Sequence, residues 1–212
     1  MCSVDCEFLT ENRFFHQTFR SCMSFSITHQ NQHFTFESSP ELFSPKNLDR
    51  GTEAMLSTVS FEPGQRVLDL GCGYGVVGIL AAKRVGAENV VMTDIEQTAV
   101  KIAQRNAERN QVAGVKIIHS DGLQDHHETD FDWILSNPPY HEDFSTAKNF
   151  IMKGFNRLKI GGHMVMVTRR RLWYQKKLTS IFGGTEVQEI DGYFVFHAEK
   201  RRAAYASQKR NR

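Results

Sequence analysis

From residue 66 to residue 182 the sequence alternates short, β-branched apolar runs with longer segments whose apolar residues recur at helical spacing. This alternation constrains the fold more than any other feature, because strands that alternate with helices pair in parallel with helices on both faces. The runs that we interpret as strands are Arg66–Leu70, Asn89–Thr93, Val115–His119, Phe131–Ser136 and His163–Thr168. The segments that we interpret as helices are Val76–Val85, Ile95–Asn110, Ser145–Leu158 and Leu172–Phe182. The sequence therefore predicts an α/β fold of the Rossmann-like, doubly wound class.

Glycines mark two further boundaries of the predicted sheet. The pair Gly161-Gly162 is expected to stop the helix that ends at Leu158. Near the C-terminus, the runs Thr185–Ile190 and Tyr193–Ala198 flank Asp191-Gly192, a dipeptide typical of two-residue hairpin turns. Since such a turn joins antiparallel strands, we expect a seven-stranded sheet that is mostly parallel and closed by a C-terminal antiparallel hairpin.

A leader precedes this core. Its runs Met23–Ile27 and His33–Glu37 alternate apolar and polar residues around a polar link, which predicts a β-hairpin. Asp49 or Thr52 is expected to cap a helix that runs to about Ser60. The predicted organisation is an N-terminal extension over residues 1–60, a core over 61–200 and a basic tail over 201–212.

The cysteines predict no disulfide framework and no metal site. A chain of 212 residues can bury a full core without either. The four cysteines form no C-x-x-C pair, so we expect reduced thiols, with a zinc site built on the first three as the alternative. Their positions are Cys2, Cys6, Cys22 and Cys72.

Charge and hydropathy exclude a membrane protein. No apolar stretch approaches the roughly 20 residues that span a bilayer, and the acidic start of the chain is unlike a secretory signal. We therefore expect a cytoplasmic protein with no membrane partner. The net charge is only +2, but the tail from Lys200 to Arg212 carries six basic residues and no acid. Such a tail fits contacts to phosphates and fits a solvated terminus equally well.

A glycine-rich loop follows the first core strand and opens a helix. It reads Asp69-Leu-Gly-Cys-Gly-Tyr-Gly75, and its glycines Gly71, Gly73 and Gly75 let the chain turn sharply and let a ligand touch backbone. The carboxylate of Asp69 would repel a pyrophosphate, whereas a ligand that bears an ammonium and a sulfonium tolerates it. This charge argument favours S-adenosylmethionine over NAD as the cofactor, and we interpret Cys72 as a small filler.

Two later strand ends extend the predicted cofactor site. Asp94, followed by Ile95, ends the second core strand at a position that suits a carboxylate bound to ribose hydroxyls. The alternative for Asp94 is a helix N-cap. Asp121-Gly122 follows the third strand and is placed to bind the adenine amino group, with a plain turn as the alternative.

The motif Asn137-Pro-Pro-Tyr140 ends the fourth core strand. Ligands of open α/β sheets bind outside the carboxyl ends of the strands. Two consecutive prolines end the strand and stiffen the backbone, which suits a site whose carbonyls must point at a substrate. An ordinary strand-ending turn is the alternative interpretation.

With these motifs the chain resembles the class I methyltransferases of the "methyltransferase small domain" family. Within that family it is similar to the small-subunit ribosomal RNA guanine-N2 methyltransferases, in a single-domain form. The resemblance covers about Phe14 to Lys200. The matching segments are Phe43-Ser44, Leu48–Thr52, Asp69–Gly75, Asp94, Asn137–Tyr140, Phe182-Gly183, Glu186-Val187 and Gly192-Tyr193.

The resemblance implies roles for the Asn-Pro-Pro-Tyr motif on a planar nitrogen. The side-chain oxygen of Asn137 and the carbonyl of Pro138 would accept the two N–H groups, Tyr140 would stack on the ring, and Asn137 would also border the cofactor. An RNA base must be splayed out to reach such a pocket. Residues expected on the substrate side are Pro139, Tyr140, His141, Phe144 and the phosphate-contact candidates Arg169, Arg170 and Arg171.

Other functions stay open at the level of the sequence. The leading hypothesis is methylation of guanine N2, with ribosomal RNA or the small ribosomal subunit as partner. Glutamine-N5 methylation of a protein such as a release factor uses the same motif, but a different leader. Adenine-N6 methylation of RNA or DNA and a non-catalytic RNA-binding module are the remaining alternatives, and an intact Asp69, Asp94 and Asn137 argues against the last. For Arg169–Arg171, a solvated loop is the alternative.

Overall fold

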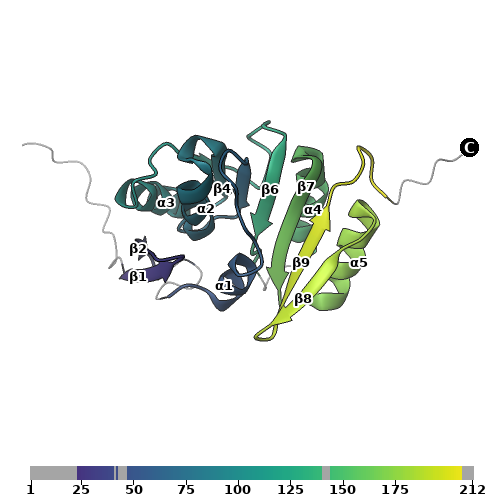
Figure 1. Ribbon diagram of the computed structural model, residues 1–212, viewed down its shortest axis with the longest axis horizontal. Coiled ribbons are helices and arrows are strands. Elements are labelled where there is room, and N and C mark those ends of the chain that lie inside the picture. Colours follow the sequence, from purple (N-terminus) through teal and green to yellow (C-terminus); the bar gives the residue numbers. More distant parts are fainter. Residues whose placement is uncertain (1–22, 41, 43–46, 140–143, 207–212) are drawn as a thin grey trace, which may run out of the picture.

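The computed structural model describes residues 23–40, 42, 47–139 and 144–206. It contains a seven-stranded sheet in the order β5-β4-β3-β6-β7-β9-β8, in which only β9 runs antiparallel to its neighbours (Figure 1). The predicted fold is confirmed, including the hairpin turn at Asp191-Gly192, where both residues adopt positive φ. The strands of this sheet are β3 (Val67–Leu70), β4 (Val90–Asp94), β5 (Lys116–His119), β6 (Phe131–Ser136), β7 (Leu158–Thr168), β8 (Glu186–Ile190) and β9 (Tyr193–Glu199).

Helices cover both faces of the sheet, and each face has its own hydrophobic cluster. The cluster with Val165 and Val167 of β7 contains α1 to α3, and the cluster with Met164 and Met166 contains α4 and α5. Alternate residues of one strand point to opposite faces, which explains this division. The helices are α1 (Arg50–Leu56), α2 (Val76–Val85), α3 (Gln97–Arg109), α4 (Phe144–Arg157) and α5 (Arg171–Phe182), with a 3-10 turn at Ala87–Asn89.

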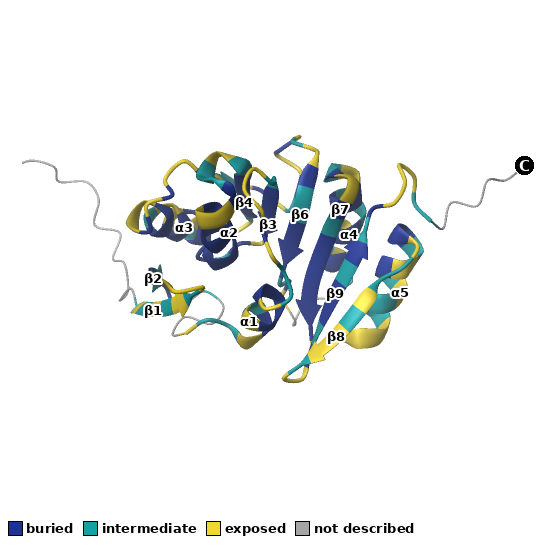
Figure 2. Ribbon diagram, viewed as in Figure 1, coloured by how far each residue is buried: buried dark blue, intermediate teal, exposed yellow. Residues whose placement is uncertain are grey.

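Burial follows this layered arrangement. The carboxyl-terminal halves of β6 and β7 are buried and dark blue in Figure 2, whereas β8 at the edge of the sheet is largely exposed. Among the residues that the structure describes, no helix combines the length and the apolar character needed to cross a membrane.

The leader forms the predicted hairpin and packs on α3. Its strands β1 (Met23–His29) and β2 (Gln32–Ser38) join through Gln30 and Asn31, both at positive φ. The buried side chain of Asn106 on α3 accepts from the Glu37 amide at 2.7 Å and donates to the Glu37 carbonyl at 2.8 Å. It also donates to the Tyr74 carbonyl at 2.8 Å, so the leader is tied to the glycine-rich loop.

The predicted end of the first helix was wrong. Helix α1 ends at Leu56 rather than near Ser60, because the hydroxyls of Ser57 and Thr58 donate to the carbonyls of Ala54 and Met55 at 2.8 Å. These bonds compete with continuation of the helix.

The glycine pair Gly161-Gly162 does not stop a helix. Helix α4 ends at Arg157, and both glycines lie inside β7. There the Gly161 amide donates to the Lys200 carbonyl at 2.8 Å, and the Lys200 amide donates to the Gly162 carbonyl at 2.9 Å. A Cβ atom at Gly162 would lie 2.6 Å from the Phe131 carbonyl oxygen, so close packing of β7 on β6 explains this glycine.

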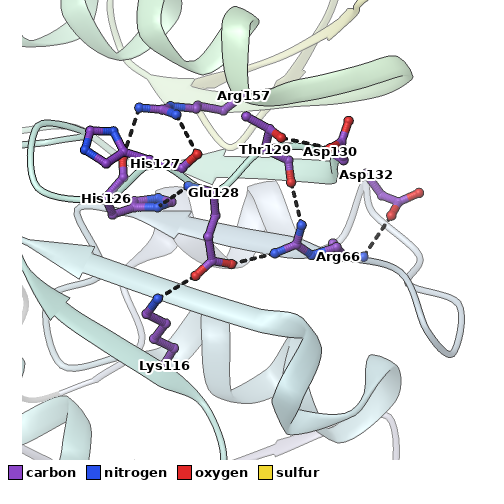
Figure 3. A network of polar contacts seen from close by, with 9 residues as sticks. All are labelled: Arg66, Lys116, His126, His127, Glu128, Thr129, Asp130, Asp132 and Arg157. Atoms are coloured by element: carbon purple, nitrogen blue, oxygen red, sulfur yellow. Dashed lines mark hydrogen bonds and ion pairs between the residues drawn. The ribbon is translucent and has the colours of Figure 1, made fainter.

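The loop between β5 and β6 is anchored near the amino ends of β3 and β5 (Figure 3). The Arg66 guanidinium donates to the Thr129 carbonyl and to Glu128, both at 2.5 Å. Lys116 donates to the other oxygen of Glu128 at 2.6 Å, and this hydrogen bond is the main reason that the pKa of Glu128 is lowered. Arg157 of α4 donates to the carbonyls of His126 and His127, the two residues before Glu128. Each pair is partly exposed and contributes little alone, but together they hold the far end of this loop.

We predict that Gly162→Ala lowers the free energy of unfolding by about 1–3 kcal/mol, the usual cost of overpacking. The matched control is Gly184→Ala, because no atom lies within 4 Å of a Cβ built there. Urea titrations of the two variants provide the measurement. Equal stability of both variants would contradict the close approach of β7 to Phe131.

Candidate active site

A cavity of about 370 Å³ lies at the carboxyl ends of β3 to β6. From β3 the strand order runs one way to β4 and β5 and the other way to β6 and β7, so the topological switch point lies between β3 and β6. Ligands of open α/β sheets bind at such a switch point. The structure brings most of the predicted site residues to this one cavity. Those that line it are Asp69, Gly71, Gly73, Asp94, Ile95, Asp121, Gly122, Asn137, Pro138 and Pro139.

The glycine-rich loop is held by the end of the neighbouring strand. The amides of Gly71 and Cys72 both donate to the Thr93 carbonyl at 2.9 Å. Gly71 and Gly73 adopt positive φ, and a Cβ at Gly73 would meet nothing within 4 Å, so a ligand can approach the backbone there. Gly75 does not line the cavity. It caps α2 at φ 91°, and its Cβ would lie 3.2 Å from Ala103, so its observed role is to turn the chain into the helix.

Asp69 is a buried acid beneath this loop. One of its oxygens accepts from the Gly78 amide at 2.9 Å. Burial is the main cause that raises the pKa of Asp69 to about 7, with a further contribution from the nearby Asp94. Burial also raises the pKa of the Cys72 thiol well above its usual value, which fits its interpretation as a filler and not a nucleophile. The acidic wall therefore favours a cationic ligand.

Asp94 links the loop to the start of α3. One of its oxygens accepts from the Gly73 amide at 2.7 Å, and the other accepts from the Glu96 amide at 2.9 Å. Glu96, not Asp94, is the N-cap residue of α3. Each carboxylate oxygen has a further lone pair for a hydroxyl donor. The adjacent Ile95 side chain is 59 % exposed and lines the same cavity.

Phe150 of α4 forms a wall that the sequence analysis did not assign to the site. A Cβ at Gly122 would lie 3.0 Å from its ring, and one at Gly71 would lie 3.7 Å away. The Asp121 carboxylate accepts from Gln124 at 2.5 Å beside this wall. A flat apolar surface next to a carboxylate suits an adenine ring and its amino group.

The Asn137 side chain is held by the start of α1. Its amide nitrogen donates to Asp49 at 2.8 Å and to the Thr52 hydroxyl at 3.0 Å. Of the two predicted capping residues, Asp49 is the N-cap of α1, and it accepts from the Thr52 amide at 2.9 Å. Both residues line the cavity, although the sequence analysis assigned them only to a helix cap.

Of the predicted substrate residues, Pro139 lines the cavity, whereas Phe144 and the three arginines do not. Tyr140 and His141 lie outside the described residues. Phe144 stacks on Trp173 with ring centroids 4.3 Å apart, and the Arg170 guanidinium lies 5.2 Å from the Phe144 ring. The same helix α4 contributes Thr146 to the cavity wall.

The other two arginines also lie over aromatic rings. Arg169 lies 4.7 Å from the Tyr193 ring and donates to its hydroxyl at 3.0 Å, and Arg171 lies 5.6 Å from Phe194. All three arginines are exposed. Each guanidinium therefore lies within cation–π distance of an aromatic ring while remaining exposed.

Comparison with known proteins decides the family. The sequence model of the "Methyltransferase small domain" family matches residues 33–197. The chain belongs to this family. In the described residues, no group of three or more histidine, cysteine or acidic side chains could hold a metal ion.

Individual relatives in the family share about a third of the residues. Ribosomal RNA small subunit methyltransferase C of Haemophilus influenzae strain PittGG is 36 % identical over 173 residues, which are 80 % of this chain and 52 % of the relative. The enzyme of the same name from Pseudomonas putida strain F1 is 33 % identical over 77 % of this chain and 50 % of its own. The chain thus spans about half the length of the curated relatives that it matches.

A solved relative shares the fold closely. The 16S rRNA guanine-N2 methyltransferase of Thermus thermophilus, solved with S-adenosylmethionine and guanosine, superimposes with a TM-score of 0.76. It is 29 % identical and covers 84 % of this chain and 50 % of its own.

The raised pKa of Asp69 predicts a pH-dependent stability. A carboxyl group with a higher pKa in the folded state contributes stability below its ordinary pKa near 4, and this contribution is lost as the pH rises through about 7. Asp69→Asn keeps an acceptor for the Gly78 amide and removes the charge. We expect the stability of this variant relative to the parent to increase by roughly 2–4 kcal/mol between pH 4 and pH 8.

Urea titrations at both pH values provide the measurement, with Asp125→Asn as the exposed control. Parallel pH profiles for the parent and Asp69→Asn would contradict burial of the charge.

Proposed function

We propose that this protein is an S-adenosylmethionine-dependent N-methyltransferase that acts on guanine N2 of small-subunit ribosomal RNA. The observation that carries the proposal is the position of Asn137-Pro-Pro at the end of β6. It shares one cavity with the glycine-rich loop at the end of β3. The names of the relatives, and the guanosine bound to the Thermus enzyme, support guanine as the base.

The residues of the cavity fit S-adenosylmethionine. Asp69 and the glycine-rich loop would bind the cationic end, Asp94 the ribose hydroxyls, and Asp121 the adenine amino group, with Ile95 beside the ring. Phe150 and Gly122 supply the flat surface on which an adenine can lie. The cofactor supplies an electrophilic methyl group on a sulfonium.

Asn137 and Pro138 act on the nucleophile. The lone pair of an exocyclic guanine nitrogen is delocalised into the ring, which makes the nitrogen a poor nucleophile. By accepting its two N–H groups, the Asn137 oxygen and the Pro138 carbonyl would pyramidalise this nitrogen and direct its lone pair. Alignment of the reacting groups supplies much of the rate. Pro139 stiffens the backbone that holds both acceptors.

The surface beside the cavity fits a nucleic acid. A guanine in a folded RNA has to be splayed out to enter the cavity, and Arg169, Arg170 and Arg171 are proposed to contact the flanking phosphates, with Phe144, Tyr140 and His141 on the substrate side. This partner also implies the cytoplasm as the location. Residues 1–60, 61–200 and 201–212 are proposed as leader, catalytic core and basic tail.

The proposal predicts a specific product. Small ribosomal subunits incubated with methyl-labelled cofactor should yield labelled N2-methylguanosine after digestion to nucleosides. Asn137→Ala should abolish this incorporation while S-adenosylhomocysteine binds with nearly parental affinity in calorimetry. The reason is that the Asn137 hydrogen bond strengthens as the nitrogen becomes positive, so it stabilises the transition state more than the ground state.

Three outcomes of this experiment would contradict the proposal. Labelled N6-methyladenosine, or labelled N5-methylglutamine in a release factor tested in parallel, would assign another planar nitrogen. Parallel loss of cofactor affinity in Asn137→Ala would show that the motif supports the cofactor pocket instead.

The arginine cluster is predicted to contact phosphates. Replacing Arg169, Arg170 and Arg171 by glutamine should weaken binding to unrelated RNA fragments by a similar factor. It should also reduce the slope of log affinity against log salt by roughly 2, because three counterion-releasing charges are lost. The matched control replaces the exposed Lys83, Arg84 and Lys101 by glutamine, on the helices α2 and α3. Equal salt slopes for the two triple variants would assign the arginines to a solvated loop.

A further inference from the structure

The Asn137 amide nitrogen donates hydrogen bonds to two residues of the leader, outside the core that carries the Asn-Pro-Pro motif. Their acceptors, Asp49 and Thr52, lie at the start of α1, 88 and 85 positions away in the sequence. In Figure 1, α1 lies near the arrowheads of β6 and β7, and Asp49 and Thr52 line the cavity at the carboxyl ends of the strands. The contact is therefore a tertiary one that folding of the leader must create.

These acceptors decide which end of the Asn137 amide serves as donor and which as acceptor. An asparagine amide has two ends of nearly equal size, and only its oxygen can accept a substrate N–H. With the amide reversed, its oxygen would face the Asp49 carboxylate oxygen and the Thr52 hydroxyl. Two acceptors on the nitrogen side therefore favour the orientation that leaves the oxygen as the acceptor for a substrate.

Thr52 and Asp49 are themselves held in place. One oxygen of Asp49 accepts from the Thr52 amide at 2.9 Å and from the Thr52 hydroxyl at 3.4 Å. The hydroxyl hydrogen is thus directed at Asp49, and a hydroxyl lone pair faces Asn137. Helix α1 is anchored by the buried Met55 and Leu56, which join the hydrophobic cluster that also contains Val165 and Val167 of β7.

We propose that Asp49 and Thr52 are positioning residues for the methylation of a planar nitrogen, acting through Asn137. The inference rests on the proposed function and extends it to the leader. The two residues hold the Asn137 oxygen toward the substrate. The Asp49 carboxylate also polarises the amide, because chains of hydrogen bonds strengthen one another in a site of low dielectric. The Asn137 oxygen thereby becomes a better acceptor for a nitrogen that develops positive charge.

The test compares the same substitution on α1 and in the turn that follows it. Thr52→Val removes a hydroxyl that contacts Asn137. Thr58→Val removes a hydroxyl that contacts the Met55 carbonyl and His197, away from the cavity. Thr52→Ser restores the hydroxyl. Single-turnover methylation at saturating substrate, the affinity for S-adenosylhomocysteine and the melting temperature are measured for each variant.

Thr52→Val should slow the single-turnover step by about 3- to 10-fold, the effect of one lost hydrogen bond, with cofactor affinity unchanged within about 2-fold. Thr52→Ser should recover the parental rate, and Thr58→Val should keep it even where its melting temperature falls further. Asp49→Asn removes the charge but keeps an acceptor oxygen on a residue that is favoured at N-caps. Its single-turnover rate should fall by a factor similar to that of Thr52→Val, because only the charge is lost. Equal rates for the two Thr→Val variants would overturn the proposal.

A second readout does not depend on the substrate. In the ligand-free protein, the side-chain amide protons of Asn137 should exchange slowly with solvent in the parent and in Thr52→Ser, and faster in Thr52→Val. Fast exchange in the parent would overturn the proposal, whatever the activity. A parent that methylates none of the candidate substrates but shows slow exchange would refute the proposed function and leave the contact of α1 with Asn137 established.

Discussion

Strands β3 and β6 pair in parallel from Val67 to Asp69 and from Trp133 to Leu135. At their carboxyl ends the buried Ser136 hydroxyl donates to the Leu70 carbonyl at 2.7 Å, between residues 66 positions apart in the sequence. This pairing places the glycine-rich loop and Asn137-Pro-Pro side by side. Without it, the acidic wall that fits the cofactor and the acceptors that fit a nitrogen would belong to separate parts of the molecule. The rest of the sheet and its helices keep these two strand ends rigid.

The leader completes the site instead of lying apart from it. Asn106 ties β2 to the carbonyl of Tyr74 in the glycine-rich loop, and Asp49 ties α1 to Asn137. The two predicted halves of the chemistry, cofactor binding and nitrogen orientation, therefore each depend on a contact with the segment before residue 60. Both contacts come from residues that precede the first core strand or pack on them.

Local patterns in the sequence predicted those parts of the structure that depend on neighbouring residues. The bounds of α2 and β6 were predicted without error, because glycines flank the helix and Asn-Pro-Pro ends the strand. The prediction for the Gly161-Gly162 pair was wrong, since the same residue type serves a helix stop and a close strand contact. Only the tertiary distance from Gly162 to the Phe131 carbonyl distinguishes the two.

Residues whose roles depend on distant partners could not be assigned from the sequence. Phe150 has the spacing of an ordinary core residue, and its place under Gly122 follows from how α4 packs on the sheet. The contact of Arg170 with Phe144, between the start of α5 and the start of α4, likewise has no signal in the sequence.

The proposed chemistry requires the Asn137 oxygen to face a guanine nitrogen in this cavity. A crystal structure with S-adenosylhomocysteine and guanosine measures this contact. The guanine N2 atom is expected about 2.7–3.2 Å from the Asn137 oxygen, with the amide nitrogen still bound to Asp49 and Thr52. Guanosine bound elsewhere, or an Asn137 amide that turns its nitrogen toward the base, would refute the proposed role of Asn137.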